Sequence, residues 1–242
     1  MEASLRGATK FEDRSDYAIA LMYLDRSPEA IALLTTLEQE QPGHFFIAAN
    51  LGTAYELSGK YKDALHWINE GIRRNPQDHE GTEWLHAKIL DAKIAQQKNP
   101  DYFEMHSVLE LQPNEIGRAI QLDGKSYSAA EVRKAIEYQL GERLQFVKPP
   151  DPAVASLLYD YAAIESVLGS MESAQHILKF ASNYGYPAEK IAVLNTDFDR
   201  RLAWGEFKTI ALISTGVLVF LGVLRILYRR GIFVISRKDL KR

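Results

Sequence analysis

The residues best suited to chemistry in this sequence are Glu80, Glu83 and His86, which are spaced by three in a segment with a helical pattern. On a helix, a Glu-x-x-His pair can present a carboxylate and an imidazole to one metal ion. The carboxylate metal sites of helical bundles need a second such pair and two further glutamates, and this chain has no second Glu-x-x-His. We therefore interpret the segment as a polar helix face and expect neither a metal nor another cofactor.

The sequence also lacks the motifs of the common catalytic sites. It has no phosphate-binding Walker loop, no dinucleotide-binding glycine fingerprint and no nucleophile elbow. It contains no cysteine, so no zinc site of the Cys/His type can form. The sequence therefore predicts a protein that is not an enzyme and has no small-molecule substrate.

Large, small and helix-breaking residues follow a regular order over residues 45–78 and predict a helical hairpin. Small residues are needed where two helices cross closely, and Gly52 and Ala64 take those places. Gly59 permits the turn between the helices, and Pro76 ends the second one because its ring cannot continue the backbone hydrogen bonding. The positions that carry the order are Leu51, Gly52, Tyr55, Ala64, Ile68, Gly71 and Pro76.

A single hairpin cannot bury its own apolar face, so similar neighbours are expected. Residues 11–44 repeat the order, with Ala30 at the place of Ala64 and Pro42 at the place of Pro76. Residues 155–188 repeat it more weakly, and residues 79–97 resemble a first helix that no second helix follows. We therefore expect two good repeats, an irregular middle and one degenerate repeat.

The irregular middle, residues 99–150, has turn-forming residues and carries enough apolar side chains to be an ordered insertion. One of the expected turns is at Asp123-Gly124-Lys125. Ser128 and Glu131 form a capping box, which predicts a helix. Asp151 and Pro152 provide the N-cap and first turn of the next helix. The apolar stripe expected on the insertion helix is Val132, Ile136, Leu140 and Leu144.

Residues 11–78 closely resemble the tetratricopeptide repeat (TPR) family, and residues 155–188 resemble it loosely. The segments HEGTEWLHAKILDAKI and FVKPPDPAV are similar to stretches of uncharacterised bacterial TPR membrane proteins, which implies a bacterial source. In TPR proteins the first helix of each hairpin lines a groove that takes a peptide or a partner helix. The resemblance implies a protein-binding groove formed by Ser15, Ile19, Met22, Phe46, Ala49, Asn50, Thr53 and Glu56.

An uncharged apolar run from Thr209 to Leu224 predicts a membrane span. About twenty helical residues reach roughly 30 Å, the thickness of the hydrocarbon core of a bilayer. We expect the span to cover residues 207–228. Apolar residues at helical spacing in residues 187–204 predict an amphipathic helix, which we expect to continue into the span with only Gly205 as an interruption.

Charge is divided unequally along the chain and bears on topology. Residues 209–242 have a net charge of +6 and residues 1–208 a net charge of −9. The acidic part argues against a nucleic-acid partner, which requires a basic surface. The positive-inside rule places the basic tail in the cytoplasm and the repeats outside it. The N-terminal residues, however, resemble no export signal, and a complete N-terminus would keep the repeats in the cytosol. Both orientations stay open.

These features predict an all-α fold, in which a TPR-like helical solenoid of about three hairpins plus an irregular insertion precedes one C-terminal transmembrane helix. The expected segments are an N-terminal tail (1–10), TPR-like repeats (11–98), the insertion with one helix (99–150), a degenerate repeat and capping helix (151–205), a transmembrane helix (207–228) and a basic tail (229–242).

The function expected from this organisation is that of a single-pass membrane scaffold or adaptor that holds a protein or peptide in its groove. One alternative is a structural subunit of a larger membrane complex, with residues 99–150 as its contact surface. Another is a tail-anchored factor that recruits proteins in the cytosol.

Overall fold

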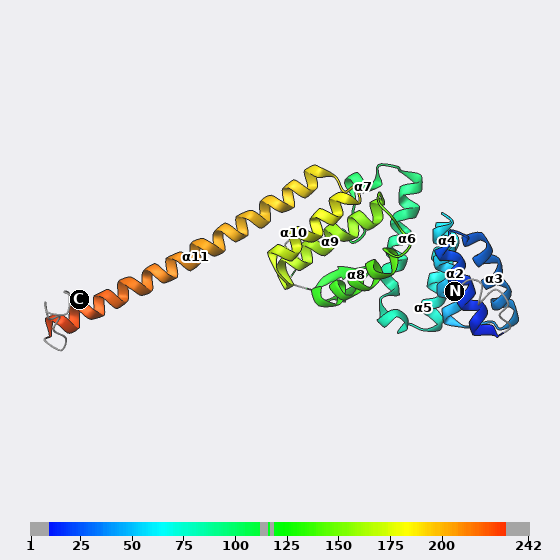
Figure 1. The fold of residues 1–242 in the computed structure, drawn as a ribbon, viewed down its shortest axis with the longest axis horizontal. Coiled ribbons are helices and arrows are strands. Elements are labelled where there is room, and N and C mark those ends of the chain that lie inside the picture. Colours follow the sequence, from blue (N-terminus) through cyan, green and yellow to red (C-terminus); the bar gives the residue numbers. More distant parts are fainter. Residues whose placement is uncertain (1–9, 112–115, 117–118, 231–242) are drawn as a thin grey trace. The chain divides into compact units, whose positions relative to one another are not determined.

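The computed structural model describes residues 10–111, 116 and 119–230, and it is largely helical (Figure 1). The chain divides into two compact units, residues 1–192 and residues 193–242. The expected N-terminal tail before Lys10 and the basic tail after Arg230 lie outside the described residues. A mostly helical chain that ends in one long apolar helix is thus confirmed, and the assignment of its hairpins to the TPR family stays a prediction.

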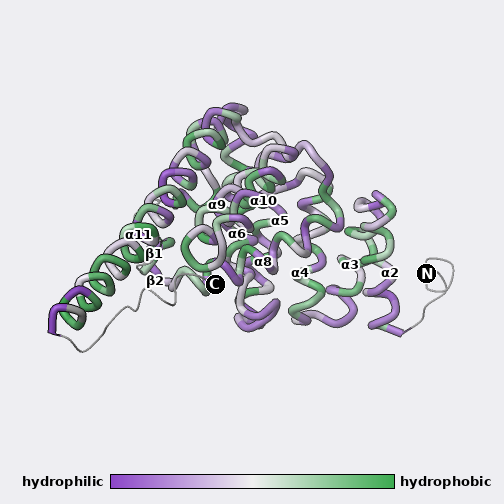
Figure 2. The backbone as a smooth tube through the Cα atoms, turned by 60° about the vertical axis from the view of Figure 1, so that its left-hand side comes forward, coloured by the Kyte–Doolittle hydropathy of each residue, from purple (hydrophilic) through white to green (hydrophobic). Residues whose placement is uncertain are grey.

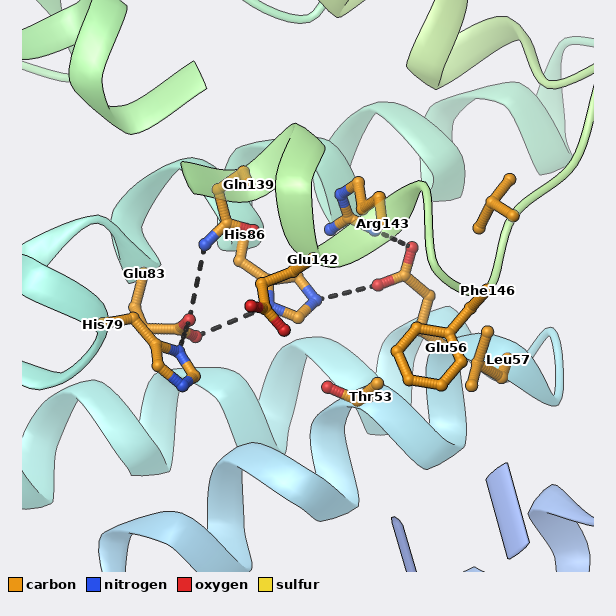
Figure 3. Close-up of a pocket in the computed structure, with 11 residues that line it drawn as sticks. Thr53, Glu56, Leu57, His79, Glu83, His86, Gln139, Glu142, Arg143 and Phe146 are labelled. Carbon is orange, nitrogen blue, oxygen red and sulfur yellow. Dashed lines mark hydrogen bonds and ion pairs between the residues drawn. The ribbon is translucent and has the colours of Figure 1, made fainter. Parts of the chain in front are cut away.

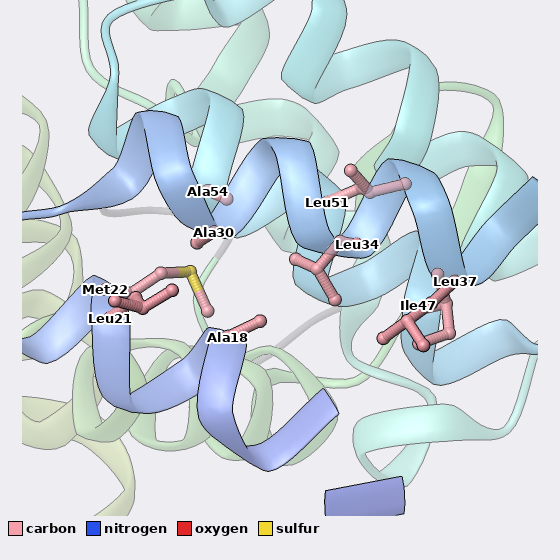
Figure 4. Close-up of a cluster of buried hydrophobic side chains, with 9 residues drawn as sticks. All are labelled: Ala18, Leu21, Met22, Ala30, Leu34, Leu37, Ile47, Leu51 and Ala54. Atoms are coloured by element: carbon pink, nitrogen blue, oxygen red, sulfur yellow. The ribbon is translucent and has the colours of Figure 1, made fainter. Parts of the chain in front are cut away.

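The described part of the chain opens with two helical hairpins, and one apolar core crosses from the first to the second. Helices α2 (Phe11–Tyr23) and α3 (Ser27–Glu40) form the first hairpin, and α4 (Phe45–Leu57) and α5 (Tyr61–Arg74) form the second. The core lies between α2, α3 and α4, so it crosses from one hairpin to the next (Figure 4). Its fully buried members are Ala18, Leu21, Met22, Ala30, Leu34, Leu37, Ile47, Leu51 and Ala54.

Gly52 lets α4 and α5 approach closely, as its place in the sequence predicts. A Cβ atom at this position would overlap the side chain of Ile68 on α5, and Ala64 is fully buried on the same helix. Gly59 has a φ of +72° in the turn between the two helices. That left-handed conformation is easily adopted only by glycine, so the turn and the close crossing both depend on these two glycines.

The chain leaves α5 through a short 3-10 helix, η1 (Asp78–Gly81), before α6 (Glu83–Lys98) begins. His79 and Glu80 have φ values of 48° and 58°, which are unusual for residues with a side chain. Glu80 therefore lies outside α6 and pairs with Lys134 at 2.8 Å. The expectation that Glu80, Glu83 and His86 share one helix face is wrong in this respect, because the helix begins three residues later.

The insertion contains a small β-hairpin that the sequence analysis did not predict. After the short helix α7 (Tyr102–Met105), strands β1 (Ile120–Leu122) and β2 (Lys125–Tyr127) pair antiparallel, with Ile120 opposite Tyr127. Asp123 and Gly124 both have positive φ, as a two-residue hairpin turn requires. Apolar side chains of the insertion are buried inside the first unit. They are Phe103, Val108, Leu109, Ile116, Ile120 and Leu122.

The next two helices begin where their capping residues predict, and a third follows them. Helix α8 (Ala129–Arg143) opens with the expected box, in which the Ser128 side chain accepts from the Glu131 backbone N–H and the Glu131 side chain accepts from the Ser128 backbone N–H. Asp151 caps α9 (Pro152–Leu168), its Oδ1 accepting from the Val154 N–H at 2.8 Å. Helix α10 (Met171–Asn183) completes the hairpin at residues 155–188.

Helix α11 (Ala188–Arg229) is one continuous helix of 42 residues. It passes through Gly205 without a break, as expected for an amphipathic segment that continues into an apolar one. From Ala203 to Val223 every side chain is exposed, and the hydropathy colours of the tube show long apolar stretches there (Figure 2). The helix is long and apolar enough to cross a bilayer, which makes it a candidate membrane span.

Candidate functional site

The candidate site is a pocket that three distant parts of the first unit line together (Figure 3). Helix α4, the segment from η1 into α6, and the end of α8 with the residues that follow it all contribute. The cavity itself has a volume of about 50 Å³, and the space around it that is open to solvent brings the total to about 470 Å³. Its lining residues are Thr53, Glu56, Leu57, His79, Glu83, His86, Gln139, Glu142, Arg143, Phe146 and Val147.

Glu56 on α4 is the acceptor that joins these parts. Its carboxylate lies 2.5 Å from Nη1 of Arg143, 3.1 Å from Nζ of Lys93 and 2.8 Å from Nε2 of His86. All four side chains are buried. Burial alone would raise the pKa of the Glu56 carboxyl, but the positive charges of Arg143 and Lys93 and the hydrogen bond to His86 hold that pKa well below its usual value. Glu56 is therefore an ionised carboxylate inside the protein.

Glu83 at the start of α6 is a second buried carboxylate next to the first. It pairs with Nδ1 of His79 at 2.5 Å, and Nε2 of Gln139 donates to it at 3.4 Å. Its pKa is lowered because the hydrogen bonds to His79 and His86 outweigh the effect of burial, which is to raise it. His79 has a left-handed backbone conformation in η1, and this conformation directs its ring toward Glu83.

His86 bridges the two carboxylates. Its Nε2 lies 2.8 Å from Glu56, and its Nδ1 lies 3.5 Å from Glu83. An ionised carboxylate only accepts hydrogen bonds, so two carboxylates around the ring favour a proton on each ring nitrogen, which is the imidazolium form. The pKa of His86 is raised accordingly: burial and the charge of Arg143 lower it, but the hydrogen bonds to Glu56 and Glu83 outweigh them. We call Glu56, Glu83, His86, Lys93 and Arg143 the charged cluster.

Arg143 is only partly satisfied within this cluster. Its Nη1 pairs with Glu56, whereas Nε and Nη2 are buried and have no hydrogen-bond partner in the part of the chain that the structure describes. A buried donor without a partner costs about 1–3 kcal/mol. Arg143 therefore keeps two unpaired nitrogens inside the protein, on a side chain that is 6% exposed.

The residues expected to line a protein-binding groove have different environments in the structure. Ser15, Met22, Ala49 and Glu56 are between 3% and 6% exposed. Ile19, Phe46, Asn50 and Thr53 keep part of their surface, and the Asn50 side chain donates to Ser15 Oγ at 3.4 Å. Only Thr53 and Glu56 line the pocket. Protein binding by these eight residues stays a prediction. A binding surface here would be formed by the four residues that are partly exposed.

Lys93 and Arg143 were not among the residues expected at a site, because charged residues on a helix ordinarily face solvent. The expected stripe of α8 ended at Leu144, yet Leu144 is 46% exposed and Arg143 is buried in its place. The spacing of Arg143 from Ile136 and Leu140 is seven and three residues, which puts it on their face. An arginine on an apolar stripe was thus the available indication of a buried charge.

Another buried carboxylate, that of Asp160 on α9, lies away from the pocket and contacts the insertion. Asp160 accepts from the Leu109 backbone N–H at 3.3 Å, and Ser156 Oγ accepts from the Val108 N–H at 2.8 Å. Burial raises the pKa of Asp160 to about 7, although the hydrogen bonds from Leu109 and Ser107 lower it. Asp160 therefore holds the backbone around residue 109 in place, and its buried carboxyl group loses its proton at a higher pH than an exposed aspartate does.

Among the described residues no group of three or more His, Cys, Asp and Glu side chains is arranged to hold a metal ion. The charged cluster alternates cations with carboxylates, which suits mutual neutralisation. Comparison with protein-family models and with curated proteins finds no match for this chain.

Proposed function

We propose that this protein is a membrane-anchored scaffold or adaptor, in which TPR-like helical hairpins hold another protein or a peptide at a membrane surface. The observation that carries the proposal is α11, a candidate membrane span that belongs to the same chain as a folded unit of helical hairpins. Such an adaptor needs a membrane anchor and a folded unit with a surface for binding.

Two features support a polypeptide as the partner. Hairpins that stack on a common core form extended surfaces, which helical-repeat proteins use to bind other chains. Residues 1–208 carry a net charge of −9, which favours a partner segment with basic residues. The alternative of a complex subunit that docks through residues 99–150 has less support, because the apolar residues of that insertion are largely buried.

Membrane anchoring is tested by alkaline carbonate extraction of cell membranes. The full chain is expected in the membrane pellet, and Leu218→Glu with Leu221→Glu is expected to release it, because charges at the centre of a span cost several kcal/mol. Val193→Glu is the control, since Val193 is 70% exposed and Leu218 is 69% exposed, but Val193 precedes the expected span. Extraction of the unaltered chain would refute the anchor.

Partner binding is tested by placing a photoreactive amino acid at Phe46, with Lys62 on the exposed face of α5 as the control position. A discrete crosslinked product is expected from position 46 and not from position 62. Asn50→Ala with Thr53→Arg should abolish that product while thermal stability changes little. Equal crosslinking from both positions, or a product that survives the double substitution, would count against a binding groove.

The side of the membrane on which the hairpins lie is decided by protease protection of an N-terminally tagged chain in sealed membranes. Protection of the tag from cytosolic protease favours an exported unit with partners outside the cytosol. Cleavage favours a tail-anchored factor that recruits cytosolic proteins.

A further inference from the structure

The turns of α11 just before its apolar run carry basic and aromatic side chains on one face. Arg200, Trp204 and Lys208 follow one another at intervals of four, so they lie one above the other along the helix. Phe207 stacks on Trp204 with 5.6 Å between the ring centroids, and the two side chains are 61% and 57% exposed. This part of α11 therefore presents two large rings and two cations to its surroundings.

These side chains also contact one another. Nζ of Lys208 lies 5.4 Å from the centre of the Trp204 ring, which is the geometry of a cation–π interaction. Arg200, Trp204 and Phe207 border a shallow hollow together with the small side chain of Ala203. Because Lys208 reaches back to a ring one turn earlier, its ammonium lies away from the apolar run and beside the hollow.

The two cations on this face are available to a ligand. Arg201 pairs with Asp197 at 2.6 Å, whereas in the part of the chain that the structure describes neither Arg200 nor Lys208 forms an ion pair. The other acidic residues of this stretch are at positions 199 and 206. With 3.6 residues per turn, both lie at least about 100° around the helix from the two cations. The face therefore keeps two uncompensated positive charges.

The place of this face along α11 puts it at the boundary of the expected membrane span. Lys208 and Arg225 bound the uncharged run and are 17 positions apart, which corresponds to roughly 26 Å of helix. The hydrocarbon core of a bilayer is about 30 Å thick, so the two long side chains can extend to the headgroups on either side. Trp204, one turn before Lys208, then lies in the interfacial region, where tryptophan is enriched in membrane proteins.

We propose that the face formed by Arg200, Ala203, Trp204, Phe207 and Lys208 binds the headgroup of an anionic phospholipid, and we call it the juxtamembrane face. The two cations pair with the phosphate, and the two rings pack against the glycerol and the adjoining acyl carbons. A zwitterionic lipid binds less well, because its own cation meets the same two positive charges. The inference rests on the proposed membrane anchor and goes beyond it, since a helix can span a bilayer without preferring one headgroup.

The test is quenching of tryptophan fluorescence in the full chain, reconstituted in vesicles of equal parts phosphatidylcholine and phosphatidylglycerol. Brominated acyl chains are placed on one lipid or on the other, and bromine quenches only a tryptophan that it approaches closely. Enrichment of the anionic lipid at Trp204 therefore appears as stronger quenching by brominated phosphatidylglycerol. We expect about a fivefold preference or more, because each cation near anionic lipid contributes about fivefold. Trp204→Phe should remove this quenching, which assigns the signal to the juxtamembrane face.

Three double substitutions locate the preference. Arg200→Gln with Lys208→Gln should abolish it, so that both brominated lipids quench equally. Lys62→Gln with Lys179→Gln is the matched control, because it removes the same charge from exposed positions on α5 and α10, and it should leave the preference unchanged. Arg200→Lys with Lys208→Arg keeps both charges and should retain the preference.

The other outcomes separate this proposal from the membrane anchor on which it rests. Equal quenching of the unaltered protein by the two lipids would overturn the headgroup site and leave the anchor intact. Absence of quenching by either lipid would refute the anchor, and the site with it. A preference that survives Arg200→Gln with Lys208→Gln would overturn the assignment of lipid binding to the juxtamembrane face.

Discussion

Replacement of Asp160 by asparagine is expected to stabilise the protein at alkaline pH and to have little effect at acid pH. Burial raises the pKa of Asp160 to about 7, from the 3.8 that is usual for an aspartate. A raised pKa means that the folded protein holds this proton over a range in which the unfolded chain releases it. Stability therefore falls as pH rises from about 4 to about 7 and is constant on either side of that range.

The size of the effect follows from the shift. Each pKa unit corresponds to about 1.4 kcal/mol, so a shift of about three units destabilises the ionised form by roughly 4 kcal/mol. Asparagine has nearly the same shape and carries no charge. Its oxygen can still accept from the Leu109 N–H, and its amide can donate to Ser107. Asp160→Asn should thus exceed the unaltered protein in stability by up to about 4 kcal/mol at pH 8, and by less than about 1 kcal/mol at pH 4.

The assay is thermal or urea unfolding of the two proteins in mild detergent at half-unit steps between pH 4 and pH 8. Ser156→Ala is the matched control, because Ser156 holds the neighbouring Val108 N–H but has no titrating group. It should destabilise by about 1–2 kcal/mol at every pH. A difference between Asp160→Asn and the unaltered protein that does not grow between pH 4 and pH 7 would refute the reasoning.

Three further results are expected. Gly52→Ala should destabilise the protein by about 1–3 kcal/mol in urea unfolding, because its methyl group would overlap the side chain of Ile68 on α5. The control is Gly141→Ala on α8, whose methyl group meets open space and should stabilise the protein by about 0.5–1 kcal/mol. Equal effects of the two substitutions would contradict the close crossing. Glu56→Gln should cost about 3–5 kcal/mol, since it removes the one carboxylate that three buried cations share, and a loss below 1 kcal/mol would contradict that pairing. Limited trypsin digestion should cleave slowly over residues 200–208, because α11 is continuous there; rapid cleavage in the folded protein would show a hinge.

Much of the fold was predictable because its determinants are local. Gly52 and Gly59 act within one hairpin, and the capping box of Ser128 with Glu131 closes within three residues. Asp151 likewise caps the helix that begins at the next residue. Helical periodicity and caps are read over short windows, so hairpin positions and helix starts could be stated from the sequence.

The β-hairpin and the charged cluster were not predictable in the same way. The strands are three residues long, so no alternation of apolar residues could indicate them, although Asp123-Gly124 did mark the turn. Glu56 and Arg143 are 87 positions apart, and each lies on a helix where a charge ordinarily faces solvent. Only the packing of α8 near α4 and α6 makes them partners.

The sharing of Glu56 by several cations has a consequence for the divergence of related sequences. A change of Glu56 alone would remove a carboxylate partner from each of Arg143, Lys93 and His86, and a change of Arg143 alone would remove the shortest of the contacts to Glu56. We expect these positions to change together in evolution. Relatives with an uncharged residue at position 56 should therefore also lack the charges of Arg143 and Lys93. Relatives that keep all of them should vary freely at the exposed positions of α8, such as Lys134.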